Sequence, residues 1–187
     1  MTFRIVIADD EPIIRADLRE ALEDLGYRVI GVARNGREAL ELIEQTRPDV
    51  AILDIKMPHI DGISLAKKIG SRFPVILLTA YSDKSLINGA REAGVMAYLT
   101  KPFRERDLPP IIELAVSHFI EESSLLEHVS RLKTQLETRK LIEKAKGLLM
   151  EVEGLPEKEA YRRIQRMSMK KNKPIKEVAE AIILTLE

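Results

Sequence analysis

Val50-Ala51-Ile52-Leu53-Asp54 is the stretch that decides the fold, because four apolar residues in a row are followed directly by a carboxylate. An uninterrupted apolar run of this length predicts a strand that is buried on both faces of a parallel sheet. Asp54 would then lie at the carboxyl edge of the sheet, where open α/β sheets bind ligands. Since a single Asp after an apolar run more often just ends a strand, the interpretation depends on what the other strand ends carry.

Apolar runs and amphipathic segments alternate on both sides of this stretch. Strands are predicted at residues 3–8, 29–33, 49–54, 73–79 and 95–99, with helices at 13–25, 36–45, 60–69 and 84–93. This alternation predicts an α/β fold with a doubly wound, five-stranded parallel sheet. In the strand order 2-1-3-4-5, the first and third strands are neighbours at the topological switch point.

Residues that bind cations or phosphoryl groups follow the ends of four predicted strands. Asp9 and Asp10 follow the first, Asp54 ends the third, Thr79 ends the fourth and Lys101 comes after the fifth. Carboxylate oxygens combined with a backbone carbonyl and water suit Mg²⁺. Because phosphoryl transfer depends mainly on positioning and charge compensation, the pattern predicts a Mg²⁺ site at which Asp54 carries a phosphoryl group. Lys101 would compensate its charge and the Thr79 hydroxyl would donate to one of its oxygens.

These residues, with Met57-Pro58, Asp61-Gly62 and Lys101-Pro102, resemble the motifs of a response-regulator receiver domain over residues 1–122. The resemblance implies a flavodoxin-like fold and a regulator rather than an enzyme, with a sensor histidine kinase or a small phosphodonor as the source of the phosphoryl group. It implies that Asp54 is the phosphoacceptor, that Tyr98 is the aromatic switch residue and that the Lys101–Pro102 bond is cis. It also implies Mg²⁺ ligation by Asp9, Asp10, Asp54 and the backbone carbonyl of Lys56.

Composition favours a cytoplasmic protein. The 187 residues include 30 basic and 30 acidic side chains and no cysteine, so the net charge is zero and disulfides and thiolate metal sites are excluded. No stretch approaches the roughly 20 apolar residues of a membrane span, and the first residues lack the pattern of a signal peptide. Any binding of nucleic acid must therefore come from a local basic patch.

A long helix is predicted after the receiver-like region. It begins at Leu108-Pro109-Pro110, and residues 111–153 contain no proline and a single glycine, Gly147. Leu125, Val129, Leu132 and Leu136 follow a 4-3-4 spacing within residues 123–136, which predicts a short coiled coil of about two heptads. This seam would form a homodimer or pack on the chain's own tail, and the homodimer is favoured because no other apolar surface nearby would cover it.

Residues 137–187 are predicted to form a bundle of three helices, made from the end of the long helix and two segments at 157–171 and 175–186. Ala160, Tyr161, Ile164 and Met167 are predicted on the inner face of the second helix. Tyr161 is ambiguous, because an aromatic ring can also stack on an unpaired base, and its helical register with Ile164 favours the core.

A basic run without any acidic residue extends from Tyr161 to Lys176. Such a run predicts a surface that binds a polyanion, although most basic clusters are simply solvated helix faces. The candidate RNA-binding residues are Arg162, Arg163, Arg166, Lys170, Lys171 and Lys173, with Lys176 at the end of the run. The residue pattern alone does not separate RNA from DNA, since three short helices with a basic face also suit a helix-turn-helix.

Residues 137–187 are similar to the ANTAR domain of AmiR/NasR-type transcription antitermination regulators. The similarity is carried by residues 144–150, 159–161, 167–169 and 178–182. It implies binding of RNA hairpins in nascent transcripts and transcription antitermination, controlled by phosphorylation of Asp54. Two alternatives remain at this stage: a DNA-binding transcriptional regulator, and a protein-interaction module that binds no nucleic acid.

Overall fold

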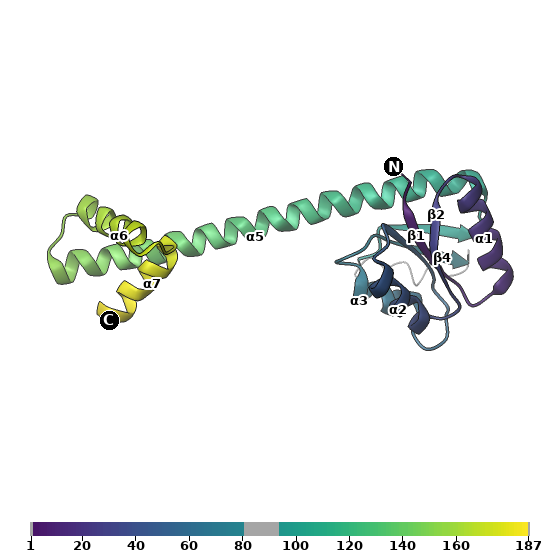
Figure 1. The fold of residues 1–187 in the computed structure, drawn as a ribbon, viewed down its shortest axis with the longest axis horizontal. Coiled ribbons are helices and arrows are strands. Elements are labelled where there is room, and N and C mark those ends of the chain that lie inside the picture. The colour runs from purple at the N-terminus through teal and green to yellow at the C-terminus, as the bar shows by residue number, and fades with distance from the viewer. Residues whose placement is uncertain (1, 81–93, 187) are drawn as a thin grey trace. The chain divides into compact units, whose positions relative to one another are not determined.

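The computed structural model of the chain describes residues 2–80 and 94–186. The chain divides into two compact units, Met1–Ser124 and Leu125–Glu187, and each is described by itself (Figure 1). The helix predicted at residues 84–93 lies outside the described residues.

A five-stranded parallel sheet forms the centre of the first unit, in the order β2-β1-β3-β4-β5. The predicted fold class and strand order are therefore confirmed. Every residue of the middle strand β3 is buried, as its uninterrupted apolar run indicates. The strands are β1 (Arg4–Ala8), β2 (Arg28–Ala33), β3 (Val50–Asp54), β4 (Val75–Ala80) and β5 (Ala97–Lys101).

Helices cover both faces of this sheet (Figure 1). Helices α2 (Gly36–Thr46) and α3 (Gly62–Ile69) pack on one face, where Val6 and Leu53 contribute to the core. Helix α1 (Pro12–Asp24) and the first turns of α5 pack on the other, against Ile7 and Ile52. Neighbouring residues of one strand thus point to opposite faces of the sheet. Because helices cover both faces, the strands show no alternation of polar and apolar residues.

The fifth strand differs from its predicted span and begins two residues later. Ala97 to Lys101 pair in register with Ile76 to Ala80 of β4, so Lys101 is the last residue of the strand and not a loop residue. Backbone pairing with β4 extends the strand past its last apolar residue, Leu99. The Lys101–Pro102 bond is cis, as the family resemblance implies. A short 3₁₀ helix, Glu105–Asp107, then precedes the long helix.

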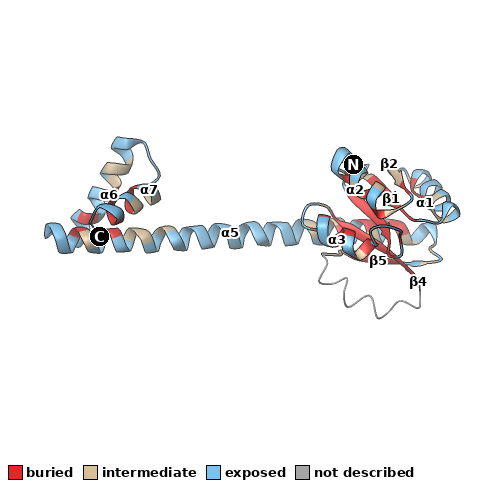
Figure 2. Ribbon diagram, turned by 90° about the horizontal axis from the view of Figure 1, so that it is seen from below, coloured by how far each residue is buried: buried red, intermediate tan, exposed pale blue. Residues whose placement is uncertain are grey.

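The predicted long helix is present as α5, which runs from Leu108 to Glu153 and contains 46 residues. Pro109 and Pro110 lie in its first turn, where the amide groups have no partner within the helix. Residues 121–137 are exposed throughout (Figure 2). The seam residues Leu125, Val129, Leu132 and Leu136 are between 41% and 65% exposed. Within the described ranges, no helix has the length and apolarity to cross a membrane.

The second unit contains the end of α5 together with α6 (Glu157–Lys171) and α7 (Ile175–Leu186). Ala145, Leu149, Ala160, Ile164 and Ile182 are among the residues that form its core. Tyr161 does not belong to this core, because 40% of the residue is exposed. The prediction of a core tyrosine was wrong, since Ala160 and Ile164 define the inward direction of α6 and the next residue is turned away by about 100°.

Candidate functional site

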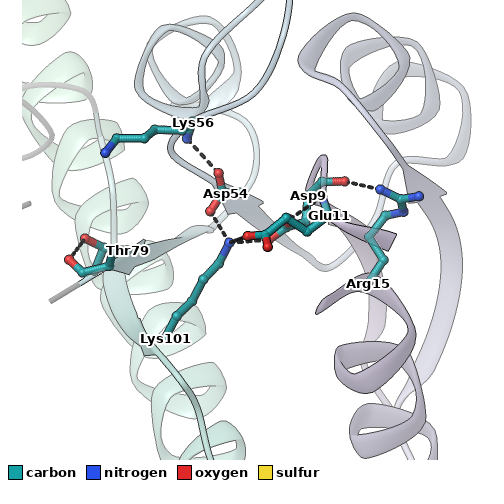
Figure 3. Close-up of polar contacts among 8 residues, drawn as sticks. Asp9, Glu11, Arg15, Asp54, Lys56, Thr79 and Lys101 are labelled. Carbon is teal, nitrogen blue, oxygen red and sulfur yellow. Dashed lines mark hydrogen bonds and ion pairs between the residues drawn. The ribbon is translucent and has the colours of Figure 1, made fainter. Parts of the chain in front are cut away.

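The carboxyl edge of the sheet brings together three charged side chains from different strands. Lys101 Nζ lies 2.6 Å from Asp9 Oδ2 and 2.5 Å from Asp54 Oδ1 (Figure 3). Asp9 follows β1 and Asp54 ends β3, and these two strands are neighbours in the sheet. Lys101 reaches them from the edge strand β5, two positions away from β3. The ammonium group is thus held between two carboxylates.

Asp54 is almost completely buried, with 6% of the residue exposed. Its Oδ2 accepts a hydrogen bond of 2.7 Å from the backbone N–H of Lys56, while Oδ1 contacts Lys101. Burial raises the pKa of the Asp54 carboxyl, and the contacts with Lys101 and the Lys56 amide offset this only partly. Burial lowers the pKa of Lys101, but the contacts of its ammonium group with the carboxylates of Asp54 and Asp9 outweigh this and leave that pKa raised.

The loop after β1 presents an acidic group that fits a hard cation. One carboxylate oxygen from each of Asp9, Asp10 and Glu11 lies within 4.8 Å of the others. Asp9 Oδ1 accepts from the Glu11 amide at 2.9 Å, and Arg15 donates to the Asp9 backbone carbonyl at 2.6 Å. Asp9 Oδ2 is buried and accepts no hydrogen bond of ordinary geometry, although Lys101 lies beside it. An oxygen-only donor set with a buried and incompletely satisfied carboxylate suits Mg²⁺.

An open pocket of about 260 Å³ joins this acidic loop to the end of β3. Asp10, Glu11, Asp54, Lys56 and Lys101 are among the residues that line it. A phosphoryl donor entering the pocket would therefore meet the carboxylate of Asp54, the acidic loop and the Lys101 ammonium together.

The remaining predicted site residues are Thr79, Lys56 and Tyr98. Thr79 is buried on β4, next to β3, but its hydroxyl donates to the carbonyl of Ala80 at 3.1 Å and is not directed to Asp54 (Figure 3). The side chain of Lys56 points away from Asp54, to which only its backbone amide donates. Tyr98 is partly buried against the core that α2 and α3 cover.

Gly62 fixes the position of the loop that follows Asp54. A Cβ at Gly62 would lie 2.1 Å from the backbone carbonyl oxygen of Asp54, and the Gly62 amide donates to Ile55 at 2.9 Å. Asp61 caps α3 by accepting from the Ser64 amide. The motif Asp61-Gly62 is visible in the sequence, but the close approach to Asp54 requires the three-dimensional structure.

The second unit divides the predicted basic residues into two groups. Arg163 pairs with Glu153, Lys173 with Glu177 at 3.2 Å and Lys176 with Glu137 at 3.9 Å. In contrast, no described residue forms an ion pair with Arg162, Arg166, Lys170 or Lys171. Lys171 lines a pocket of about 180 Å³ beside Leu149 and Met167.

Lys158, Arg162, Arg166 and Lys170 recur every four residues along the exposed side of α6, and we call them the basic stripe. Residues four apart are neighbours on a helix surface. Lys158 is not among the residues predicted from the sequence, because Glu157 and Glu159 flank it and exclude it from the acid-free run. On the helix surface, Glu157, Lys158 and Glu159 point in different directions. Glu157 forms an ion pair with Lys146 at 2.8 Å.

Comparisons with known proteins match a different family to each of the two units of the chain. The response regulator receiver domain matches residues 5–113, and the ANTAR domain matches residues 130–183. The chain is 49% identical over 185 residues to the transcriptional regulatory protein PdtaR of Mycobacterium tuberculosis, covering 98% of this chain and 90% of PdtaR. It is 34% identical to the uncharacterized transcriptional regulatory protein YhcZ of Bacillus subtilis, covering 80% and 74% of the two chains.

Solved structures resemble the first unit. The signal receiver domain of a modulated diguanylate cyclase from Desulfovibrio desulfuricans superimposes with a TM-score of 0.61 and 32% identity, covering 65% of this chain and 99% of that domain. The receiver domain of AraT from Geobacillus stearothermophilus gives a TM-score of 0.57 and 33% identity, with coverage of 65% and 98%.

Proposed function

This chain belongs to the response regulators that join a receiver domain to an ANTAR domain, and we propose that phosphorylation of Asp54 in the first controls binding of hairpin RNA by the second. The domain limits that we propose are 1–122 for the receiver, 123–136 for the coiled coil and 137–187 for the RNA-binding bundle. The output is transcription antitermination, the activity that characterises ANTAR domains. This assignment favours RNA over the alternatives of duplex DNA and a protein partner.

The observation that carries the first half is the position of Lys101 between Asp9 and Asp54. An Asp54 oxygen forms the new bond to phosphorus, while the bond from phosphorus to the histidine nitrogen of a sensor kinase, or to the acetate oxygen of acetyl phosphate, breaks. Lys101 compensates the negative charge that gathers at this carboxylate. Thr79, after rotation of its hydroxyl away from Ala80, donates to a phosphoryl oxygen, and Tyr98 is the proposed switch residue.

Asp9, Asp10, Asp54 and the backbone carbonyl of Lys56 would hold Mg²⁺ in this site. When bound, the ion supplies positive charge that compensates the carboxylates and the incoming phosphoryl group. The fit rests on the acidic loop, whose carboxylate oxygens lie close together, and on the buried Asp9 oxygen that lacks a hydrogen bond. Glu11 N–H and Arg15 hold that loop by their hydrogen bonds to Asp9.

The basic stripe and the neighbouring Arg163, Lys171 and Lys173 form the proposed RNA-binding surface. The stripe supports this assignment because its cations are exposed and have no acidic partner among the described residues. Arg163 and Lys173 are partly compensated by Glu153 and Glu177, so we expect them to contribute less.

The seam of α5 would place two such surfaces in one particle. Its four apolar residues are exposed, and within residues 125–186 no segment of the same chain covers them. Their spacing is that of a coiled coil, so we propose that a second copy of the chain pairs with them. Two linked RNA-binding surfaces raise the effective concentration for a target with two hairpins.

Reversal of three stripe charges tests the RNA-binding half. We expect Arg162→Glu, Arg166→Glu and Lys170→Glu, combined in one variant, to weaken binding to hairpin RNA strongly in a filter-binding titration. Each lost phosphate contact lowers the salt slope by roughly 0.7 to 0.9, or about 2 to 3 in total. Asp54 should still be labelled by acetyl phosphate, because the altered residues lie in the other unit.

A charge-matched control separates the stripe from net charge. Arg37→Glu, Lys67→Glu and Lys68→Glu change the net charge equally, at exposed positions of the receiver, and should leave RNA affinity unchanged. Equal loss in both triple variants, or wild-type affinity in the stripe variant, would contradict the proposed surface. Tighter binding to duplex DNA than to hairpin RNA would favour the DNA-binding alternative.

A further inference from the structure

A groove of about 470 Å³ opens between α5 and α6 in the second unit. Helix α5 contributes Thr134, Thr138, Arg139 and Ile142, and α6 contributes Tyr161. All of these residues belong to one unit, so the groove is a feature of the bundle itself. We call it the Tyr161 groove.

Tyr161 is unusually placed for a large aromatic residue on a helix that packs in a small bundle. It is 40% exposed, lies outside the bundle core and makes no hydrogen bond to the described part of the chain. Aromatic side chains provide large apolar surfaces, and tyrosine usually pairs its hydroxyl when it is buried. The ring therefore forms an accessible wall of the groove and does not serve the core.

The groove combines this ring with polar groups and one unpaired cation. Arg139 is exposed and unpaired within residues 94–186, while the acid of the groove, Glu143, contacts Lys146 at 2.6 Å. The hydroxyls of Thr134 and Thr138 donate to backbone carbonyls one turn earlier, so their oxygen lone pairs stay available as acceptors. An apolar peptide would leave these polar groups unsatisfied, whereas a planar base with polar edges satisfies them.

We propose that the Tyr161 groove takes one unpaired base of the bound RNA, stacked on the Tyr161 ring with its edge toward Arg139 and the two threonine hydroxyls. This inference rests on the proposed function, since it assumes that the second unit binds RNA. It adds the chemical class of the contact: a single-stranded nucleotide in the hairpin loop, in place of paired bases in the stem. Single-stranded RNA is recognised in general by such stacking and edge contacts.

Lys158 connects the groove to the basic stripe. It lies three residues before Tyr161 and four before Arg162, so it is a surface neighbour of both on α6. A strand whose base enters the groove would therefore carry its phosphates toward Lys158 and along the stripe. The groove then contacts a base of the RNA, and the stripe contacts its phosphate backbone.

A tryptophan at position 161 provides a direct probe, because the protein contains no tryptophan. The probe RNAs are hairpins of one fixed stem, closed either by a pool of randomised loops or by a loop of abasic riboses with the same number of phosphates. In full-length Tyr161→Trp, we expect the randomised loops to quench the fluorescence and the abasic loop to leave it unchanged. Equal quenching by both loops would overturn the proposal, because the ring would then sense only the backbone.

Affinities of the Tyr161 variants give an independent test. Tyr161→Ala should weaken binding of the randomised loops by about 5- to 150-fold, the range for loss of one stacked base, and leave binding of the abasic loop unchanged. Tyr161→Phe should retain wild-type preference for base-bearing loops. Circular dichroism melting should be the same for all three proteins, because the ring lies outside the core.

The outcomes separate this inference from the function on which it rests. If the wild-type protein binds base-bearing and abasic loops equally well and Tyr161→Ala changes neither, the groove takes no base while RNA binding stands. If the wild-type protein binds neither RNA, while the stripe variant behaves identically, both the inference and the proposed function fail. A Tyr161→Ala variant that loses both RNAs equally would also overturn the stacking role.

Discussion

The receiver and the ANTAR unit place their charged side chains in opposite environments. In the receiver, Lys101 is 15% exposed and lies between two nearly buried carboxylates, so each charge has a fixed partner. In the ANTAR unit, the cations of the basic stripe are exposed and have no acidic partner among residues 94–186. A buried cluster in which every charge is paired suits a reaction at a single atom. An exposed row of unpaired cations suits the binding of a long, flexible polyanion.

Removal of the proposed phosphoacceptor, Asp54, gives the largest expected effect and tests whether phosphorylation is confined to the receiver. Asp54→Asn should abolish labelling by acetyl phosphate with Mg²⁺, because an amide oxygen is a poor nucleophile. Mass spectrometry of the intact protein measures this. RNA binding by the unlabelled protein should be unchanged. A variant that still gains one phosphoryl group would show that another residue is the acceptor.

A charge in the seam tests whether the seam joins two copies of the chain in a dimer. Leu132→Lys puts an ammonium group in the middle of an exposed apolar row, so a dimer should dissociate toward one chain in sedimentation equilibrium. Ser130→Lys, on the same helix but off the seam, should leave the mass unchanged. If the wild-type protein is already monomeric at every concentration, the seam does not mediate dimerisation.

Two glycines should respond in opposite directions because one is enclosed and the other is not. Gly62→Ala should destabilise the receiver by about 1 to 3 kcal/mol, since its Cβ would lie 2.1 Å from a backbone oxygen. Gly147→Ala should stabilise the ANTAR unit by up to about 1 kcal/mol, because alanine favours a helix and nothing lies within 4 Å of the new Cβ. Hydrogen exchange measured on peptides from each unit would resolve both effects.

The ion pair between Lys146 and Glu157 gives the smallest expected effect. The hydrogen bond from Lys146 holds the pKa of the Glu157 carboxyl below its ordinary value. The pair therefore stabilises the folded bundle above the ordinary pKa of a glutamate, and this stabilisation is lost as the pH falls through the lowered pKa. Glu157→Gln should lower the melting temperature slightly at neutral pH and should have no effect in strong acid.

More of the receiver site than of the proposed RNA-binding surface could be predicted from the sequence, and the reason lies in the geometry of sheets and helices. Parallel strands all end at one edge, so knowing that Asp9, Asp54 and Lys101 stand at strand ends predicts that they meet. The orientation of the Thr79 hydroxyl and the close approach of Gly62 to Asp54 depend on packing details that strand order does not determine.

On α6, the neighbours in the sequence are not the neighbours in space. A run of adjacent basic residues contains both paired and unpaired cations, because successive positions point about 100° apart. Lys158 therefore stands between two acids in the sequence but joins a row of cations on the helix surface. The register of Tyr161 with Ile164 predicts a core position, whereas the structure leaves Tyr161 exposed. Only the contacts of α6 with α5 identify its inward direction.

The four-residue spacing of the basic stripe also determines its handedness and curvature. Each step of four residues advances about 6 Å and turns about 40° around the axis of α6, so the row from Lys158 to Lys170 winds through about 120°. A flat anionic sheet, such as a bilayer surface, can touch only part of such a winding row at once. A strand that itself curves can follow the whole row, so the geometry of α6 selects for the shape of its ligand as well as for its charge.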